Sequence, residues 1–174
     1  MSRKTGWRPV TVSALILIPS ALVVATPHSL QLQFASSQPI ASHSAAEDVL
    51  KNIPDKLQPI KVVDALPPAV RDALVLLFHQ KSLQMANAGG RFNATDFVDK
   101  RYPMRRLIFA AVTGDKCLVH YERGGWSHNY YALIFRIDKH QNANLIWSAS
   151  YRAAAKNISG LKTGPHFDVP ESNL

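Results

Sequence analysis

The sequence contains a single cysteine, Cys117, among its 174 residues. One thiol cannot form an intramolecular disulfide, and it cannot supply the paired cysteines of a structural zinc site or a redox motif. The fold must therefore be stabilised by an apolar core, which a hydrophobic content of 47% allows. Because Cys117 stands within an apolar run, we expect a buried and inert thiol.

Recognisable catalytic signatures are missing as well. The chain has no Gly-x-Ser-x-Gly elbow, no His-Glu-x-x-His, no phosphate-binding glycine loop and no dinucleotide fingerprint. These absences exclude an assignment of function from a known hydrolase, zinc-protease or nucleotide-enzyme motif. Nothing in the sequence predicts a cofactor.

Charge of one sign is only moderately enriched, although the formal net charge is +8. Residues 27–90 carry five basic and five acidic side chains, whereas residues 91–174 carry twelve basic and seven acidic ones. This excess is far below that of a dedicated nucleic-acid-binding domain, so we expect no nucleic-acid partner.

Long hydrophobic runs are missing too, with one partial exception near the N-terminus. Residues 10–25 are uncharged and follow a segment with three cations and no acid. As a helix this run would span roughly 24 Å, short of the ~30 Å hydrocarbon core of a bilayer. Residues 1–25 therefore predict a signal peptide, with an uncleaved N-terminal anchor as the alternative. Both place the protein outside the cytoplasm, in a periplasmic or extracellular location, and residues 26–43 are expected to be a flexible spacer.

Two helices are expected before the middle of the chain. Ser44 and Glu47 have capping-box spacing, which predicts a short helix ending at Pro54. A long helix is predicted over residues 67–87, beginning at a proline pair and ending at Gly89-Gly90. Its apolar positions recur at helical spacing: Val70, Leu74, Leu77, Phe78 and Met85, widened by Val75, Leu76 and Leu83. So broad an apolar face predicts packing against the rest of the domain.

Residues 105–150 contain four short apolar runs separated by Gly, Asp, Asn or charged clusters, which predicts four successive strands. A short helix is predicted over residues 151–159, and an irregular tail over residues 163–174. We therefore expect one α+β domain over residues 44–162, with the long helix packed on a four-stranded antiparallel meander. This order is similar in topology to cystatin-like or NTF2-like domains, and the similarity implies no function.

The central hairpin of this meander carries the candidate site. Pairing Val119 with Tyr131 would place like faces together and would set Glu122 opposite His128. A polar cluster is then expected near the Gly124-Gly125 turn, and its members are His120, Glu122, Arg123, Trp126, His128 and Tyr130.

Three interpretations of this cluster remain open from the sequence: a metal or catalytic site, a binding site, and a structural contact. His120, Glu122 and His128 could bind a metal ion, or a Glu–His pair could act in acid–base hydrolysis. The cluster could instead bind a small ligand or a partner in the cell envelope. The structural interpretation is a cross-strand Glu–His hydrogen bond with His–Tyr packing. We expect a non-catalytic binding module, with the hydrolase as the alternative.

A basic cluster precedes the first predicted strand and consists of Lys100, Arg101, Arg105 and Arg106. It could contact anionic lipid weakly, in addition to any membrane contact made by the N-terminal segment. The alternative is a solvated flank that protects the edge of the sheet.

Overall fold

The fold is that of a computed structural model, which describes residues 48–170 and residue 174. The predicted signal peptide, the spacer and the capping box at Ser44 lie outside the described residues. The helix expected there is present at residues 48–51. Among the residues described, no helix has both the length and the apolar character needed to cross a bilayer.

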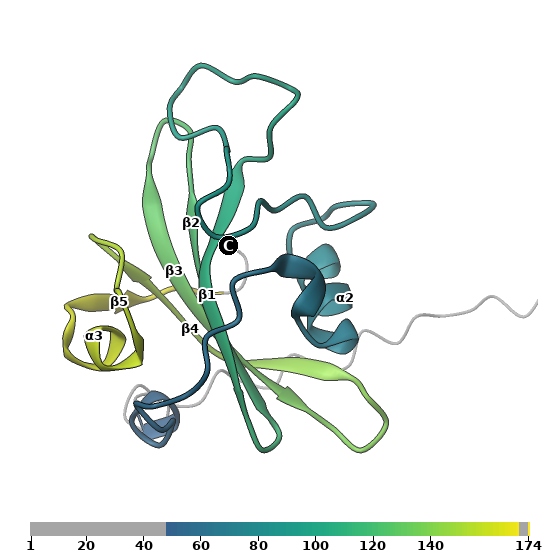
Figure 1. The fold of residues 1–174 in the computed structure, drawn as a ribbon, viewed down its shortest axis with the longest axis vertical. Helices are drawn as coiled ribbons and strands as arrows, with labels where there is room; N and C mark the ends of the chain where they lie inside the picture. Colours follow the sequence, from purple (N-terminus) through teal and green to yellow (C-terminus); the bar gives the residue numbers. More distant parts are fainter. Residues whose placement is uncertain (1–47, 171–173) are drawn as a thin grey trace, which may run out of the picture. The chain divides into compact units, whose positions relative to one another are not determined.

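One antiparallel sheet dominates the structure, so the α+β class is confirmed. Its five strands lie in chain order (Figure 1): β1 Arg105–Thr113, β2 Lys116–Arg123, β3 Asn129–Ile137, β4 Ala143–Tyr151 and β5 His166–Asp168. The first four coincide with the four apolar runs. These runs form strands because their aliphatic and aromatic side chains pack well on a pleated surface.

The fifth strand corrects the prediction of an irregular tail. β5 pairs with β4, with Phe167 opposite Ser150. The predicted helix over residues 151–159 is also wrong, because α3 spans Ile158–Thr163. The Asn157 side chain accepts a hydrogen bond from the Gly160 N–H and caps the helix there. The cap therefore sets the start of α3, and the preceding alanines are not helical.

The long helix predicted over residues 67–87 is shorter than expected. A 3₁₀ turn, η1, at Val63–Ala65 precedes α2, which ends at Leu77 after beginning at Pro68. His79 adopts a positive φ of 52°, and the Gln80 N–H bonds the Val75 carbonyl oxygen. This is the hydrogen-bonding pattern of a Schellman C-cap, with histidine where glycine is usual.

The helical periodicity beyond Leu77 has a different cause. Leu83 and Met85 pack on the same core as α2, but from an irregular segment. Ala86 then forms a parallel bridge with Arg106 of β1. Apolar spacing alone does not distinguish a helix from an extended segment that crosses the same core.

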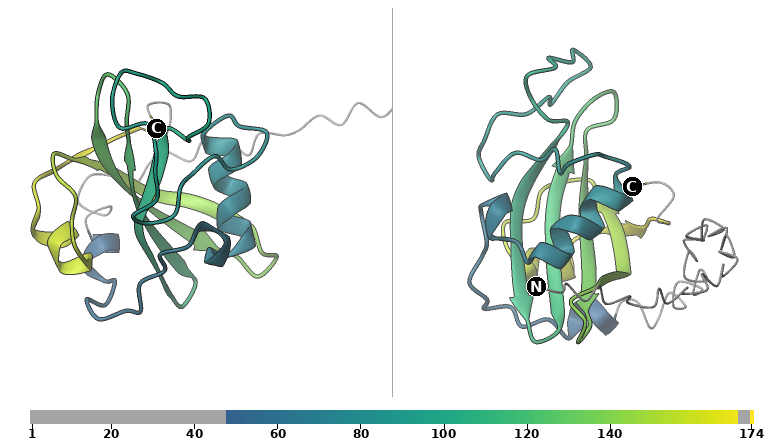
Figure 2. Two further views of the ribbon diagram at one scale, coloured as in Figure 1. Left: turned by 45° about the horizontal axis from the view of Figure 1, so that its top comes forward. Right: turned by 90° about the vertical axis from the view of Figure 1, so that its right-hand side faces the viewer.

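The sheet is buried on both faces (Figure 2). α2 lies over one face. Its buried side chains share a core there with side chains of β1, β2 and β3. Residues 48–53 and α3 cover the other face, where Trp147 is the largest buried side chain. Cys117 lies in the α2-side core, and burial raises the pKa of its thiol to about 12, which accords with an inert thiol.

The register of the central hairpin differs from the prediction by two residues. Val119 pairs with Leu133, and Glu122 pairs with Tyr130. A shift of two preserves the face of every side chain, whereas a shift of one would have reversed them all. The predicted faces are therefore correct, although the predicted cross-strand partners are wrong.

Packing of α2 on the sheet can be tested by two leucine substitutions on the same helix. Leu74 is 0% exposed and Leu76 is 76% exposed. We expect Leu74→Ala to lower the free energy of unfolding by about 2–5 kcal/mol, because it leaves a cavity in the core. Leu76→Ala should change it by less than about 0.5 kcal/mol. Urea unfolding measures both, and equal effects would contradict this placement of α2.

Candidate functional site

The predicted cluster is divided between the two faces of the sheet. His120, Glu122 and Tyr130 lie on the α3 side, because they alternate with the residues of the α2-side core. Arg123 lies on the α2 side, opposite Arg105 across the β1–β2 pair. Successive residues of a strand point to opposite faces, so Glu122 and Arg123 cannot share a site.

His120 is completely buried and makes two hydrogen bonds to the backbone. Its Nδ1–H donates to the Tyr131 carbonyl oxygen at 2.8 Å, and its Nε2 accepts from the Ala155 N–H at 3.0 Å. This arrangement requires the neutral imidazole. Burial lowers the pKa of His120 to about 4, an effect opposed by its hydrogen bond to Tyr131 and by the Glu122 charge. The Nδ1 bond therefore joins β2 to β3, and the Nε2 bond joins β2 to the chain before α3.

Glu122 makes the predicted contact with His128 and a second contact that sequence reasoning missed. His128 Nε2 donates to Oε2 at 2.8 Å, and Arg106 Nε donates to Oε1 at 2.7 Å. The His128 ring also lies 5.1 Å from the Tyr130 ring. Arg106 is the cross-strand neighbour of Glu122, so the pairing of β1 with β2 would have predicted this ion pair.

The hydrogen bonds of His120 and Glu122 bear on the metal site predicted from the sequence. The described residues contain no group of three His, Cys, Asp or Glu side chains able to hold a metal ion. His120 has no free ring nitrogen, and each oxygen of Glu122 already accepts a bond. Through its two contacts Glu122 links β1 to the hairpin turn.

The basic cluster does not form one surface. Lys100 and Arg101 are exposed, and Arg101 Nη2 lies 2.6 Å from Asp99 Oδ2. Arg106 is paired with Glu122, whereas Arg105 points into the α2-side core. Because Arg105 and Arg106 are consecutive in β1, they lie on opposite faces of the sheet.

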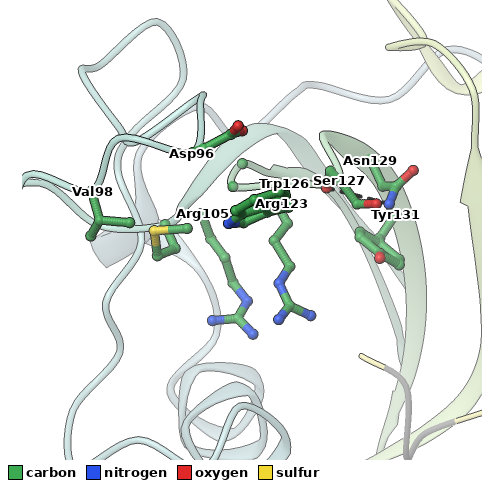
Figure 3. Close-up of a pocket in the computed structure, with 11 residues that line it drawn as sticks. Asp96, Val98, Arg105, Arg123, Trp126, Ser127, Asn129 and Tyr131 are labelled. Carbon is green, nitrogen blue, oxygen red and sulfur yellow. Dashed lines mark hydrogen bonds between the residues drawn. The ribbon is translucent and has the colours of Figure 1, made fainter.

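A cavity of about 470 Å³ lies on the α2 side at the end of the hairpin (Figure 3). Its lining comes from the loop before β1, from β1 itself and from the hairpin: Asp96, Val98, Met104, Arg105, Arg123, Gly124, Gly125, Trp126, Ser127, Asn129 and Tyr131. Arg123 and Trp126 are the two predicted site residues that reach it. Trp126 is 91% exposed.

Close packing of two loops forms the cavity wall. The Gly124 N–H donates to the Met104 carbonyl oxygen at 2.9 Å, and a Cβ at position 124 would overlap the backbone of Asn93. Gly125 has a φ of 103°, which a residue with a side chain rarely adopts. The glycine pair therefore allows the loop over residues 91–104 to lie against the hairpin turn.

Two arginines, Arg105 and Arg123, line the cavity. Their guanidinium groups extend in the same direction in Figure 3, and both donate to the main-chain oxygen of Leu174, at 3.4 Å from Arg105 and 3.1 Å from Arg123. The Arg105 guanidinium also lies 3.9 Å from the centre of the Phe78 ring. Burial lowers the pKa of Arg105, and the charge of Arg123 adds to this effect. Among the described residues, no Asp or Glu side chain forms an ion pair with either arginine.

The buried histidine generates a pH prediction. The unfolded chain binds a proton at His120 near pH 6.5, whereas the folded protein does so only near pH 4. The folded state should therefore lose about 3 kcal/mol of stability from this group as the pH falls through that interval. Urea unfolding between about pH 7 and pH 4 measures the loss.

Two variants separate this effect from general acid destabilisation. His120→Gln should be less stable near neutral pH, because it loses buried hydrogen bonds, and its stability should depend less steeply on pH. The exposed His140→Gln should keep the slope of the wild-type protein. A wild-type slope in His120→Gln would contradict the assignment to this imidazole.

Comparison of the chain with protein-family models, with curated proteins and with solved structures finds no match in any of the three. Its function is therefore inferred from the geometry and chemistry of the site.

Proposed function

We propose that this chain is a non-catalytic, exported module of the cell envelope that binds a small ligand in the cavity beside the β2–β3 turn. The observation that carries the proposal is the cavity, in which Arg105 and Arg123 stand beside apolar side chains and form no ion pair with an Asp or Glu side chain among the described residues. Positive charge beside apolar walls in a concave site favours a binding role.

The dimensions of the cavity favour a small ligand over a protein partner. A volume of about 470 Å³ lies within the range of ordinary small-molecule sites. The lining also has the usual character of such sites, since apolar walls from Val98, Met104 and Trp126 surround a few polar groups.

The alternative function, a metal-dependent or acid–base hydrolase at His120, Glu122 and His128, has less support. Both nitrogens of the histidine and both oxygens of the carboxylate are occupied within the protein. A general base must reach a proton of the substrate; His120 has no free ring nitrogen, and Glu122 is buried and already bonded to Arg106 and His128.

Export is supported by the composition of residues 1–25 alone, which has the order of a basic segment, an apolar run and a small-residue exit. The similarity to cystatin-like or NTF2-like topology stays a hypothesis about the fold. The proposal takes no function from it.

Trp126 offers a direct test, because its side chain is exposed and makes little contribution to the core. We expect Trp126→Ala to recover several-fold less ligand from an envelope extract, measured as ligand-bound protein by native mass spectrometry. Loss of an aromatic wall removes contact area without removing buried structure, so the melting temperature should be unchanged.

The matched control is Leu76→Ala, which removes an exposed apolar side chain on α2 that does not line the cavity. It should recover as much ligand as the wild-type protein. Equal recovery by the wild-type protein and Trp126→Ala would remove the support for a site at this cavity.

A further inference from the structure

We propose that one end of the sheet docks on the surface of an anionic phospholipid bilayer, with Phe97 and Trp126 entering its interfacial layer. This end consists of the loop over residues 91–104 and the β2–β3 turn over residues 124–128, and we call it the tip. The inference goes beyond the proposed function, because Phe97 does not line the cavity.

The first support is that exposed apolar side chains gather at the tip. Among the described residues, seven large apolar side chains are exposed, and three of them belong to the tip: Phe97 at 84%, Val98 at 54% and Trp126 at 91%. Phe97 and Trp126 are the two most exposed of the seven. Single exposed apolar side chains are ordinary, whereas several on one surface mark an interaction site.

The second support is that the tip projects from the fold. The loop and the turn lie at the same end of the sheet and extend past α2 and α3 in Figures 1 and 2. The Gly124 N–H bonds the Met104 carbonyl oxygen and holds the two segments together. A stable protein interface needs a broad face of about 800 Å² on each partner, whereas the interface of a bilayer accepts individual aromatic side chains. A bilayer therefore fits a projecting tip better than a protein partner does.

The third support is that the loop is already ordered. Asn93 is buried, and its amide nitrogen donates to the carbonyl oxygens of Asp99 and Tyr102. Its amide oxygen accepts from the Asp99 N–H at 2.8 Å. These bonds close the loop between residues 93 and 99, so that residues 94–98 form its apex. An apex held in this way loses little conformational entropy when it docks.

The fourth support is the direction of the side chains at the apex. Asp96 and Val98 line the cavity, and the Asp96 side chain points toward it in Figure 3. Phe97 lies between these two residues, does not line the cavity and is exposed to solvent. The acidic side chain at the apex therefore faces the cavity, while the aromatic ring is free to meet a bilayer.

The fifth support is the charge beside the aromatic side chains. Arg91, Lys100 and Arg101 are exposed on the loop, and Asp99 is paired with Arg101. Residues 91–174 as a whole carry twelve basic and seven acidic side chains. Exposed aromatic residues flanked by lysine and arginine are typical of surfaces that bind anionic bilayers, because the cations meet the lipid phosphates while the rings enter the interface.

The experiment measures contact between Trp126 and lipid. The full chain is mixed with vesicles of phosphatidylcholine and phosphatidylglycerol whose acyl chains carry bromine, which quenches tryptophan fluorescence on contact. The chain has three tryptophans, so the difference between the wild-type protein and Trp126→Phe gives the signal of Trp126. We expect this signal to be quenched. Insertion of residues 1–25 into the vesicles does not by itself bring Trp126 into contact with lipid.

Variants test whether the tip makes the contact. Phe97→Ser should lose most of the Trp126 quenching, because it removes apolar area that the bilayer buries, and its melting temperature should be unchanged. The matched control is Phe167→Ser, which makes the same change at a 55% exposed position on β5 and should keep the quenching. Lys100→Gln should weaken the quenching at low salt, whereas Lys139→Gln, in the exposed turn between β3 and β4, should not.

The inference is overturned if Trp126 is not quenched, or if Phe97→Ser and Phe167→Ser are quenched equally. Equal quenching in vesicles of phosphatidylcholine alone would also overturn it, since the positive charges would then have no part in docking. Phe97→Ser should recover as much cavity ligand as the wild-type protein, because Phe97 does not line the cavity. Failure of this inference therefore remains distinguishable from failure of the proposed function.

Discussion

The antiparallel pairing of β1 with β2 at Arg105–Arg123 is the constraint on which both faces of the site depend. Because side chains alternate between faces, this one ladder sends Arg106 and Glu122 to the α3 side and Arg105 and Arg123 to the α2 side. The first pair has opposite charges and forms an ion pair at 2.7 Å. Arg105 and Arg123 have like charges and line the cavity. A shift of one residue in the register of a strand would move its side chains to the opposite face of the sheet.

The two arginines of β1 show how environment determines the use of a charge. Arg106 meets a buried carboxylate and stacks on Phe92, so it holds the loop before β1 against the hairpin. Arg105 meets the face of the Phe78 ring and the main-chain oxygen of Leu174. Removing either charge from water is costly, and Arg106 recovers that cost through the Glu122 side chain. Arg106 therefore makes a structural contact, whereas Arg105 lines the candidate cavity.

Much of the fold was predictable, because strands in this chain are short apolar runs with clear boundaries. The first four strands and the faces of the central hairpin were predicted correctly, whereas the length of α2 was not. Leu83 and Met85 have helical spacing, but they pack on the core after a Schellman cap at His79 has ended the helix. The strand β5 was missed because three residues with one apolar side chain carry too little pattern to be identified without their partner, β4.

The sequence by itself determined the α+β class, the first four strands, the buried cysteine and the proximity of Glu122 to His128, since each depends on local composition or on alternation within one hairpin. The tertiary structure decided what those residues can do. In the folded chain both nitrogens of His120 bond the backbone, and Arg106 pairs with Glu122. Arg105 of β1 and Arg123 of β2 both donate to Leu174. The physical reason is that the state of a buried polar group depends on its partners, and segments distant in sequence supply them.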